Sequence, residues 1–281
     1  MNNLLCVRNK EVYFYPVEEN CLYPIENNLL SRAFLKLCHV SKKAIPDLFI
    51  KEEVYNFDKI IITDSAFTIS LYKALIKKKR KKDLVLYYMN NIDKTNEYMM
   101  DYFEEIYSFD LEDAQKYSIH FKHTPYSKNI KYHQAEITYD TLFLGRAKDR
   151  IEEIIRLKDF LDSKQLKNKF LVLDADRKDI KLNAFLSYEK YLDLVARSKC
   201  LIEINKKNQV GCSLRFMEAI FLKKKLITNN IFVSNDLYFD KNNVYILGHD
   251  NRDIINFINS PYVDNNINLD ELTFTNWIKG F

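Results

Sequence analysis

Short apolar runs alternate with amphipathic helical patterns along almost the whole chain, and this alternation constrains the fold more than any other feature. The runs have the length and continuous hydrophobicity of strands that are buried on both faces. The first strand candidates are 2–7, 12–17, 59–64, 84–88 and 104–109. Between them lie helical stretches such as 28–42 and 66–79. The apolar face expected on 28–42 comprises Leu29, Leu30, Phe34, Leu35 and Cys38. This strand–helix–strand order predicts an α/β fold with parallel sheets covered on both faces.

The same pattern begins again after His133, which predicts a second α/β domain. The second series comprises strand 141–144, helix 149–162, strand 170–174, helix 188–198, strand 200–204, helix 213–222 and strands 225–228 and 244–247. Ser187 is placed to cap one of these helices. Two Rossmann-like domains facing a cleft are therefore expected, spanning 1–136 and 137–262. A C-terminal helical segment, 263–281, follows them, and its apolar positions fit either a helix that crosses back to the first domain or a cap on the second.

Composition places the chain among globular proteins and excludes several other classes. Of the 281 residues, 47% are hydrophobic and 29% are charged, and no run of about 18 apolar residues is present to form a transmembrane helix. The N-terminus lacks the basic start and apolar core of a signal peptide. Five cysteines without a C-x-x-C pair indicate neither a disulfide framework nor a zinc site. These features are typical of a cytoplasmic protein.

One basic block, Lys77–Lys82, stands out from a net charge of only +4. It is interpreted first as the solvated last turn of a helix, where cations complement the helix dipole. It also fits a contact with anionic lipid headgroups, at about 1 kcal/mol for each basic residue near such a surface. Peripheral attachment to the inner face of the cell membrane is therefore a compatible hypothesis.

The most informative stretch, 209–230, leads from a buried strand into a helix. Gly211 lets the backbone approach a ligand closely, and Ser213 can cap the helix, whose first N–H groups suit a phosphate. Arg215 and Glu218 share one face of this helix because they are three residues apart. An arginine for a diphosphate and a carboxylate for ribose hydroxyls is the pairing that a nucleoside diphosphate needs. An ordinary intrahelical ion pair explains the same spacing equally well.

This stretch resembles the donor-site segment of bacterial GT-B glycosyltransferases that build capsule, lipopolysaccharide and other surface glycans. In those enzymes a glycine loop opens a helix of the form (S/T)-x-R-x-x-E-A, and a Lys-Leu-Ile-Thr strand follows. The matching positions here are Ser213, Arg215, Glu218, Ala219 and 225–228. Further segments resemble segments of the same enzymes and occur in the same order along the chain, so the resemblance covers most of 105–281. These segments are 109–114, 143–150, 188–200, 242–244 and 274–278.

The resemblance implies a cytoplasmic GT-B enzyme with the acceptor on its first domain and a nucleotide-sugar donor on its second. Such an enzyme moves a sugar to a growing, lipid-linked surface glycan: lipopolysaccharide, lipooligosaccharide or capsule. The donor diphosphate would lie between the 145–150 loop and the helix start at 211–215, with Glu218 on the ribose. The implied donor-binding residues are Gly145, Arg146, Lys148, Arg150, Gln209, Gly211, Ser213, Arg215 and Glu218. Positive groups and helix dipoles, rather than a metal or another cofactor, would assist departure of the diphosphate.

Two aspects of the catalysis stay open at this point. Many retaining GT-B enzymes carry a second glutamate eight positions before the one matched by Glu218, and here that position is Val210. The stereochemical outcome is therefore not assigned. A base for an inverting reaction would come from the first domain, where Asp64 and His123 are the candidates. Each also fits a structural role, Asp64 as a helix N-cap and His123 as a loop residue.

Two other functions compete with this interpretation. Asp174 and Asp176 follow a strand and form the D-x-D motif of metal-dependent GT-A glycosyltransferases, in which carboxylates hold a divalent cation. Arg177 and Lys178, which come next, also fit an ordinary charged turn. A non-catalytic nucleotide- or RNA-binding module would explain the basic runs and the many tyrosines. However, most aromatic residues occur at core-type spacings, so no nucleic-acid partner is expected. A dehydrogenase is disfavoured because no G-x-G-x-x-G follows a strand.

Overall fold

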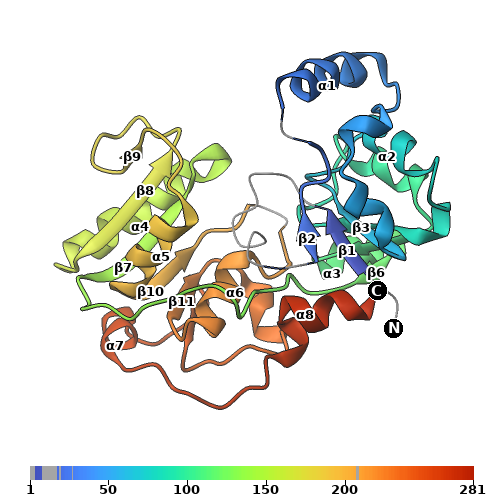
Figure 1. The fold of residues 1–281 in the computed structure, drawn as a ribbon. Helices are drawn as coiled ribbons and strands as arrows, with labels where there is room; N and C mark the ends of the chain where they lie inside the picture. The colour runs from blue at the N-terminus through green and yellow to red at the C-terminus, as the bar shows by residue number, and fades with distance from the viewer. Residues whose placement is uncertain (1–3, 8–17, 19, 27, 207–208) are drawn as a thin grey trace. The chain divides into compact units, whose positions relative to one another are not determined.

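The computed structural model describes residues 4–7, 18, 20–26, 28–206 and 209–281. The chain divides into two compact units (Figure 1). Unit 1 comprises 1–129 together with 270–281, and unit 2 comprises 130–269. The sequence predicts domain boundaries after 136 and after 262. The structure instead places 130–136 and 263–269 in unit 2. The last twelve residues, 270–281, belong to unit 1.

Unit 1 contains a six-stranded parallel sheet in the order β2-β1-β3-β4-β5-β6. Its strands are β1 Leu4–Val7, β2 Cys21–Leu22, β3 Lys59–Thr63, β4 Leu84–Tyr88, β5 Glu105–Ser108 and β6 His120–Phe121. The strands predicted near 2–7, 59–64, 84–88 and 104–109 are confirmed, whereas the one predicted at 12–17 lies outside the described residues. β3 and β4 are almost completely buried, as expected for parallel strands covered on both faces.

The helices of unit 1 are α1 Leu29–Ser41, α2 Ile69–Leu75, α3 Leu111–Tyr117 and α8 Phe274–Trp277. α2 is shorter than the predicted 66–79 because Thr68, rather than Asp64, caps it: the Thr68 hydroxyl accepts the N–H of Leu71 at 3.1 Å. The helix ends at Leu75, so the basic block Lys77–Lys82 lies beyond it instead of forming its last turn. The 3₁₀ turns of this unit are Asp47–Phe49, Glu52–Asn56, Lys81–Asp83, Glu97–Tyr102, Asp270–Leu272 and Ile278–Gly280.

The apolar face of α1 is oriented differently from the prediction. Leu35 and Cys38 pack against the core of unit 1. Leu29, Leu30 and Phe34, which were expected on the buried face, are 84%, 68% and 44% exposed. Helical spacing shows which residues share a face, but it does not show whether another element covers that face.

The C-terminal segment packs on the sheet of unit 1. Its backbone pairs with Tyr126, whose N–H donates to Leu272 and whose carbonyl accepts the N–H of Phe274 at 2.8 Å. The Trp277 ring packs edge-on against Tyr87 of β4, with ring centroids 4.9 Å apart. Trp277 Nε1 also donates to the carbonyl of His123 at 2.7 Å. These contacts explain why Leu272, Phe274 and Trp277 are buried.

Unit 2 contains a second six-stranded parallel sheet, in the order β12-β11-β10-β7-β8-β9. Its strands are β7 Tyr139–Arg146, β8 Asn168–Leu173, β9 Lys181–Leu182, β10 Ser198–Glu203, β11 Lys225–Thr228 and β12 Val244–Ile246. All five strands predicted in this part of the sequence are confirmed. The chain proceeds outward from β7 to β9, then returns to place β10 on the other side of β7. The point where the strand order reverses therefore lies between β7 and β10.

The helices of unit 2 are α4 Ile151–Ser163, α5 Tyr188–Ala196, α6 Leu214–Phe221 and α7 Ile254–Asn259. Its 3₁₀ turns are Lys148–Arg150 and Ile231–Asn235. α4 and α7 pack in one hydrophobic cluster with alternate strand residues such as Phe143, Ile202 and Ile227. The intervening strand residues, such as Leu201, point to the other face, and α5 and α6 also contact the strands. The predicted α/β fold with two Rossmann-like parallel sheets is confirmed. Among the described residues, no helix is long and apolar enough to span a bilayer.

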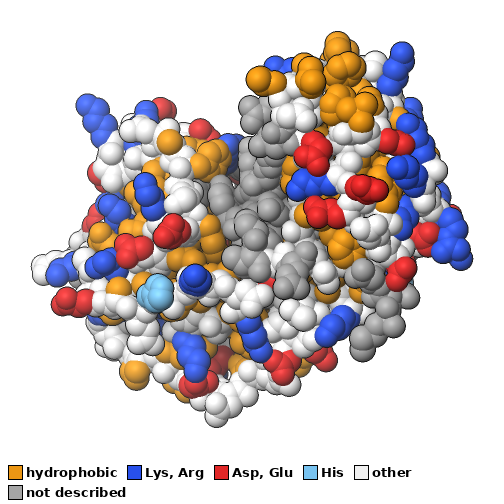
Figure 2. Space-filling view, viewed as in Figure 1, with side chains coloured by type: hydrophobic (Ala, Val, Ile, Leu, Met, Phe, Trp, Pro, Cys, Tyr) orange, Lys and Arg blue, Asp and Glu red, His pale blue; other side chains and the backbone are white. Residues whose placement is uncertain are grey.

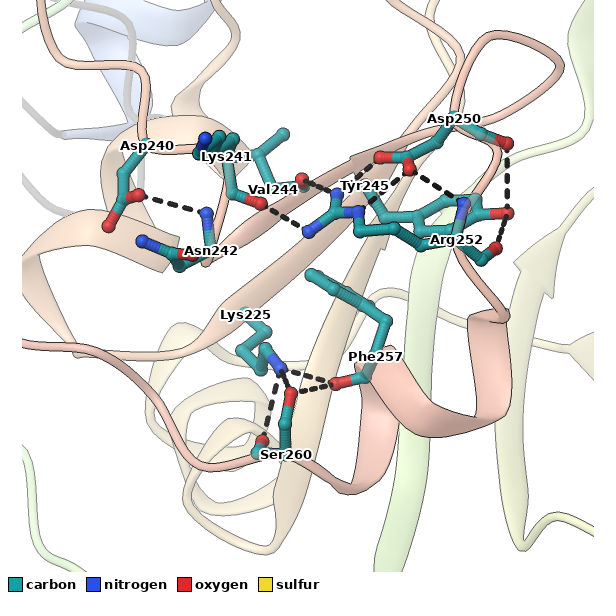
Figure 3. Close-up of polar contacts among 10 residues, drawn as sticks. All are labelled: Lys225, Asp240, Lys241, Asn242, Val244, Tyr245, Asp250, Arg252, Phe257 and Ser260. Atoms are coloured by element: carbon teal, nitrogen blue, oxygen red, sulfur yellow. Dashed lines mark hydrogen bonds and ion pairs between the residues drawn. The ribbon is translucent and has the colours of Figure 1, made fainter.

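Lys225, the first residue of the Lys-Leu-Ile-Thr strand, has a structural role (Figure 3). Its side chain is buried under α7, where Nζ lies 4.1 Å from the centre of the Phe257 ring. Nζ donates to the backbone carbonyls of Phe257 and Ser260 and to the Ser260 hydroxyl. A cation that bonds the last carbonyls of a helix stabilises its C-terminus. Lys225 thus anchors α7 to β11.

Candidate functional site

The carboxyl ends of β7 and β10 form the edge of unit 2 at which a ligand is expected. In open parallel sheets, ligands bind beyond the carboxyl ends of the strands, at the point where the strand order reverses. β7 ends at Arg146, and β10 ends at Glu203, which Ile204 and Asn205 follow. α6 begins at Leu214 after the loop from β10. The predicted donor-binding residues lie on these segments.

Gly145 lies inside β7, because the strand continues two residues beyond the predicted 141–144. A Cβ atom at this position would lie 3.1 Å from Cζ of Phe143 and 3.8 Å from Nη2 of Arg150. The absence of a side chain therefore leaves room for the buried Phe143 ring. This is a packing reason for glycine at the end of the strand.

Arg215 joins α6 to the end of β7. Its Nη2 donates to the carbonyl of Leu144 at 3.0 Å, and its Nε lies 3.2 Å from Oε2 of Glu218. The guanidinium lies 4.8 Å from the centre of the Tyr191 ring, a distance at which a cation is attracted to the ring face. Only 16% of the Arg215 side chain is exposed. The structure thus brings Arg215 and Glu218 together, as their spacing predicts.

Glu218 is buried, with 2% of its surface exposed, and both of its carboxylate oxygens accept hydrogen bonds. The hydroxyl of Tyr188 donates to Oε1 at 2.9 Å, and that of Tyr191 donates to Oε2 at 2.7 Å. Burial raises the pKa of Glu218, while Arg215 and the two tyrosine hydroxyls act in the opposite direction. These contacts fix the position of Glu218 and, through the ion pair, that of the Arg215 guanidinium.

Glu203 is a second buried carboxylate at this edge, and sequence reasoning missed it. It accepts hydrogen bonds from the hydroxyls of Ser213 and, at 2.6 Å, Thr228. Burial raises the pKa of Glu203, and these hydrogen bonds oppose the effect. Ser213 also caps α6, as predicted, by accepting the N–H of Arg215 at 3.0 Å. The sequence feature that could have identified Glu203 is that it is a single glutamate inside the otherwise apolar run 200–204.

Three side chains at this edge have buried N–H donors that make no hydrogen bond to the residues described by the structure: Arg150 at Nε, Asn205 at Nδ2, and Arg215 at Nη1 and at Nε, which has only its ion-pair contact with Glu218. They attach to the same strand ends: Arg150 Nη1 donates to the carbonyl of Ile204, which precedes Asn205, and Arg150 Nη2 to that of Arg146 at 3.2 Å. Arg215 Nη2 donates to the carbonyl of Leu144, two residues before Arg146 in β7. Buried polar atoms without a partner are uncommon, and each costs about 1–3 kcal/mol. Within the described part of unit 2, all such side-chain atoms are nitrogen donors.

Asn205 was not predicted as a site residue. It follows β10 directly and is buried, and its backbone N–H donates to Asn229 Oδ1 at 2.7 Å. The feature that could have identified Asn205 is its position directly after β10, where the strand order of the sheet reverses.

The remaining predicted donor-binding residues surround this group. Arg146 is exposed and lies 5.1 Å from the centre of the Phe185 ring. Gln209 is half-buried and Gly211 is buried. The side chain of Lys148 lies outside the described part of the chain. The backbone of Lys148 forms the 3₁₀ turn that precedes α4.

The D-x-D carboxylates follow β8 on the surface. Asp174 and Asp176 are both exposed, and Oδ2 of Asp174 lies 3.9 Å from Nε of Arg146. Asp174 adopts a left-handed backbone conformation with φ of 65°, which is typical of a turn. No group of three or more His, Cys, Asp or Glu side chains within the described ranges is placed to hold a metal ion.

The two candidate bases lie in unit 1 and contact different parts of Tyr87. Asp64 is buried and accepts hydrogen bonds from the N–H of Met89 at 3.1 Å and from Nδ2 of Asn90 at 2.9 Å. Burial raises the pKa of Asp64, and these bonds oppose the effect. The Asp64 N–H donates to the Tyr87 carbonyl, whereas the Tyr87 hydroxyl donates to the carbonyl of His123.

Unit 1 also contains a cavity of about 220 Å³ beside the carboxyl ends of β2 and β3. Its lining residues are Tyr23, Pro24, Ile25, Leu35, Ser65, Ala66, Thr68 and Leu71. Most of these side chains are apolar, and the hydroxyl-bearing residues are Tyr23, Ser65 and Thr68. Ser65, which lines the cavity, directly follows the candidate base Asp64 in the chain.

Comparison with known proteins finds similarity among solved structures. No protein-family model matches the sequence, and no curated protein matches it. Among solved structures, the chain is similar to the DNA modifying enzyme β-glucosyltransferase, whose crystal structure was determined in the presence and absence of its substrate UDP-glucose. The TM-score is 0.49 and the sequence identity is 11%, over 91% of this chain and 87% of that one.

Proposed function

We propose that the protein is a GT-B glycosyltransferase that binds the diphosphate of a nucleotide-sugar at the edge formed by β7, β10 and α6. The observation that carries this proposal is the group of buried N–H donors on Arg150, Asn205 and Arg215 that have no acceptor among the described residues. The resemblance of 209–230 to the GT-B donor segment supports the same location.

A diphosphate suits this group of donors for two physical reasons. It presents several acceptor oxygens close together, so one ligand can satisfy donors from different strands. It is also anionic, and two of the three side chains are guanidinium groups that remain charged at physiological pH. The N–H groups at the start of α6 add a positive end to the same edge.

The two arginines would stabilise the charge that develops as the diphosphate leaves the sugar. Arg215 is held in place on one side by Glu218 and on the other by the Leu144 carbonyl. Little reorganisation would therefore be needed during the reaction, and such preorganised donors are the main source of electrostatic catalysis. This role requires no metal ion.

The resemblance assigns Glu218 to the ribose of the donor. In the structure both Glu218 oxygens already accept tyrosine hydroxyls. A ribose contact would therefore exchange the hydroxyl of Tyr188 or Tyr191 for a ribose hydroxyl, which conserves the number of hydrogen bonds.

On the acceptor side, we propose that unit 1 receives a growing, lipid-linked surface glycan of the lipopolysaccharide, lipooligosaccharide or capsule type. The resemblance supports this class of acceptor, and the cavity beside Ser65 offers a place for part of it. Asp64 is preferred to His123 as the base because the next residue, Ser65, lines this cavity. Burial raises the pKa of Asp64, which makes its carboxylate a stronger proton acceptor.

The test is donor hydrolysis by the purified protein against a panel of UDP-, GDP-, dTDP- and ADP-sugars, with and without a chelator. We expect one nucleotide class to release its diphosphate, with the rate unchanged in the chelator. Activity that depends strictly on Mn²⁺ or Mg²⁺ would favour the alternative mechanism through Asp174 and Asp176. The proposed function would be refuted if the protein neither bound nor turned over any nucleotide-sugar.

A further inference from the structure

The outer face of α1 is an exposed apolar surface. Leu30, Leu37 and Val40 lie on it: Leu37 follows Leu30 by seven residues, and Val40 follows Leu37 by three. Their exposed fractions are 68%, 66% and 88%. Figure 2 shows hydrophobic side chains gathered over α1, at the top of the view. Contiguous apolar surface of this kind usually marks an interaction site.

The same part of unit 1 is basic. Residues 28–46 contain no acidic residue and four basic ones, Arg32, Lys36, Lys42 and Lys43. Lys36, Lys42 and Lys43 are exposed. Lys73 of α2 extends this region, because its Nζ donates to the carbonyl of Lys42 at 2.9 Å.

The basic residues next to α1 differ from the block at Lys77–Lys82 in how they are paired. Lys77 and Lys78 form ion pairs with Asp47, at 3.6 and 3.8 Å. Arg80 forms two hydrogen bonds with Asp83, each of 2.8 Å. Acidic side chains thus offset part of the positive charge of that block.

We propose that α1 lies flat in the interface of an anionic lipid bilayer, with its apolar face inserted and the neighbouring lysines at the headgroups. An amphipathic helix with leucine and phenylalanine on one face and lysines at its borders is the form that binds such interfaces. A second copy of the chain fits this surface less well. Packing α1 against its equivalent would bring Lys36, Lys42 and Lys43 of both copies together, and like charges repel.

This surface has a consequence for the acceptor that rests on the proposed function. Leu35, on the inward side of α1, lines the cavity of unit 1. A helix that binds the bilayer with its outer face therefore forms a wall of the proposed acceptor cavity with its inner face. A lipid-linked glycan could reach this cavity from the membrane surface.

The experiment is co-sedimentation of the full chain with vesicles of phosphatidylcholine alone or mixed with phosphatidylglycerol. The test variant is Leu30→Ser/Leu37→Ser, and the matched control is Leu237→Ser, at a residue of unit 2 that is 80% exposed. We expect the wild type and the control to bind the anionic vesicles, and the test variant to bind at least about tenfold more weakly. Lys42→Gln and Lys43→Gln should each weaken binding by about fivefold.

Three results would overturn the proposal. The first is wild-type protein that stays in the supernatant with both kinds of vesicle. The second is a Leu30→Ser/Leu37→Ser variant that binds as strongly as the control. The third is a wild type that binds no vesicles but forms a dimer in sedimentation equilibrium, when the Leu30→Ser/Leu37→Ser variant is a monomer. That result would assign the surface to a second copy of the chain. Donor hydrolysis without membranes should be the same in all variants, so that a failure here is distinct from failure of the proposed function.

Discussion

The Nε atom of Arg215 lies 3.2 Å from Oε2 of Glu218, and the same guanidinium donates to the carbonyl of Leu144. Arg215 therefore fastens the first turn of α6 to the end of β7. Two of its nitrogens, Nε and Nη1, make no hydrogen bond within the described residues, and Nε has only its ion-pair contact with Glu218. The pair contributes to the fold as well as to the proposed donor site. Any substitution here must separate these two effects.

Replacing Arg215 alone should destabilise the protein. Arg215→Met leaves a carboxylate that is 2% exposed without its cation, and breaking a buried pair in this way costs about 3–5 kcal/mol. The double variant Arg215→Met/Glu218→Gln removes both charges and keeps an amide for the two tyrosine hydroxyls. We expect most of the stability to return, but not the binding of a diphosphate.

Thermal denaturation and calorimetric titration with the preferred diphosphate would check this prediction. If the double variant bound the diphosphate as tightly as the wild type, Arg215 would have only a structural role.

Asn205 offers a variant in which stability and binding should change in opposite directions. Asn205→Leu removes a buried donor that has no partner in the described structure, so the free protein should be as stable as the wild type or about 1 kcal/mol more stable. The same change removes one of the three donors proposed to contact the diphosphate, and affinity should fall about tenfold or more. Chemical denaturation and titration calorimetry measure the two effects separately. A loss of stability without a loss of affinity would show that Asn205 supports the fold instead.

Adding a methyl group at Gly145 should disturb the site locally. In Gly145→Ala the new Cβ would lie 3.1 Å from the Phe143 ring and near Arg150, so the ring or the strand has to move. We expect a loss of about 1 kcal/mol in stability and weaker diphosphate binding. The control is Gly248→Ala, where a Cβ meets nothing within 4 Å but φ is +75°. This control should lose similar stability through backbone strain and keep its affinity.

The ion pair between Asp250 and Arg252 (Figure 3) predicts a pH dependence of stability. Hydrogen bonds from Arg252 hold the pKa of Asp250 below its ordinary value. Because the folded-state pKa is depressed, the stabilising contribution is present at neutral pH and is lost as the pH falls through the folded-state pKa. Asp250→Asn should be less stable than the wild type by about 1 kcal/mol at pH 7, and the difference should close below about pH 4. Melting curves across this range measure it, and a constant difference would contradict the assignment.

Local sequence patterns predicted much of unit 2 because the signals were themselves local. The cap residues Ser187 and Ser213 precede helices that begin where expected, and the strand Lys225–Thr228 has the predicted bounds. The adjacency of Arg215 and Glu218 follows from helical periodicity alone.

The rest depended on contacts between residues far apart in the chain. Glu203 and Asn205 become part of the site only because β10 pairs with β7. The exposure of Leu29 and Leu30 depends on which elements cover α1, and helical periodicity does not reveal this. Asp64 was interpreted as a possible helix cap, whereas its carboxylate bonds to Met89 and Asn90 after the next strand.

The most direct measurement of the central claim is a thermal-shift experiment with nucleoside diphosphates, the matching nucleosides and inorganic pyrophosphate. A ligand that binds only the folded protein raises its melting temperature. We predict that at least one nucleoside diphosphate raises the Tm of the wild type, that the matching nucleoside does not, and that the rise is much smaller in Asn205→Leu. The account is contradicted if no diphosphate shifts the Tm, or if the shift is equal in the wild type and in Asn205→Leu.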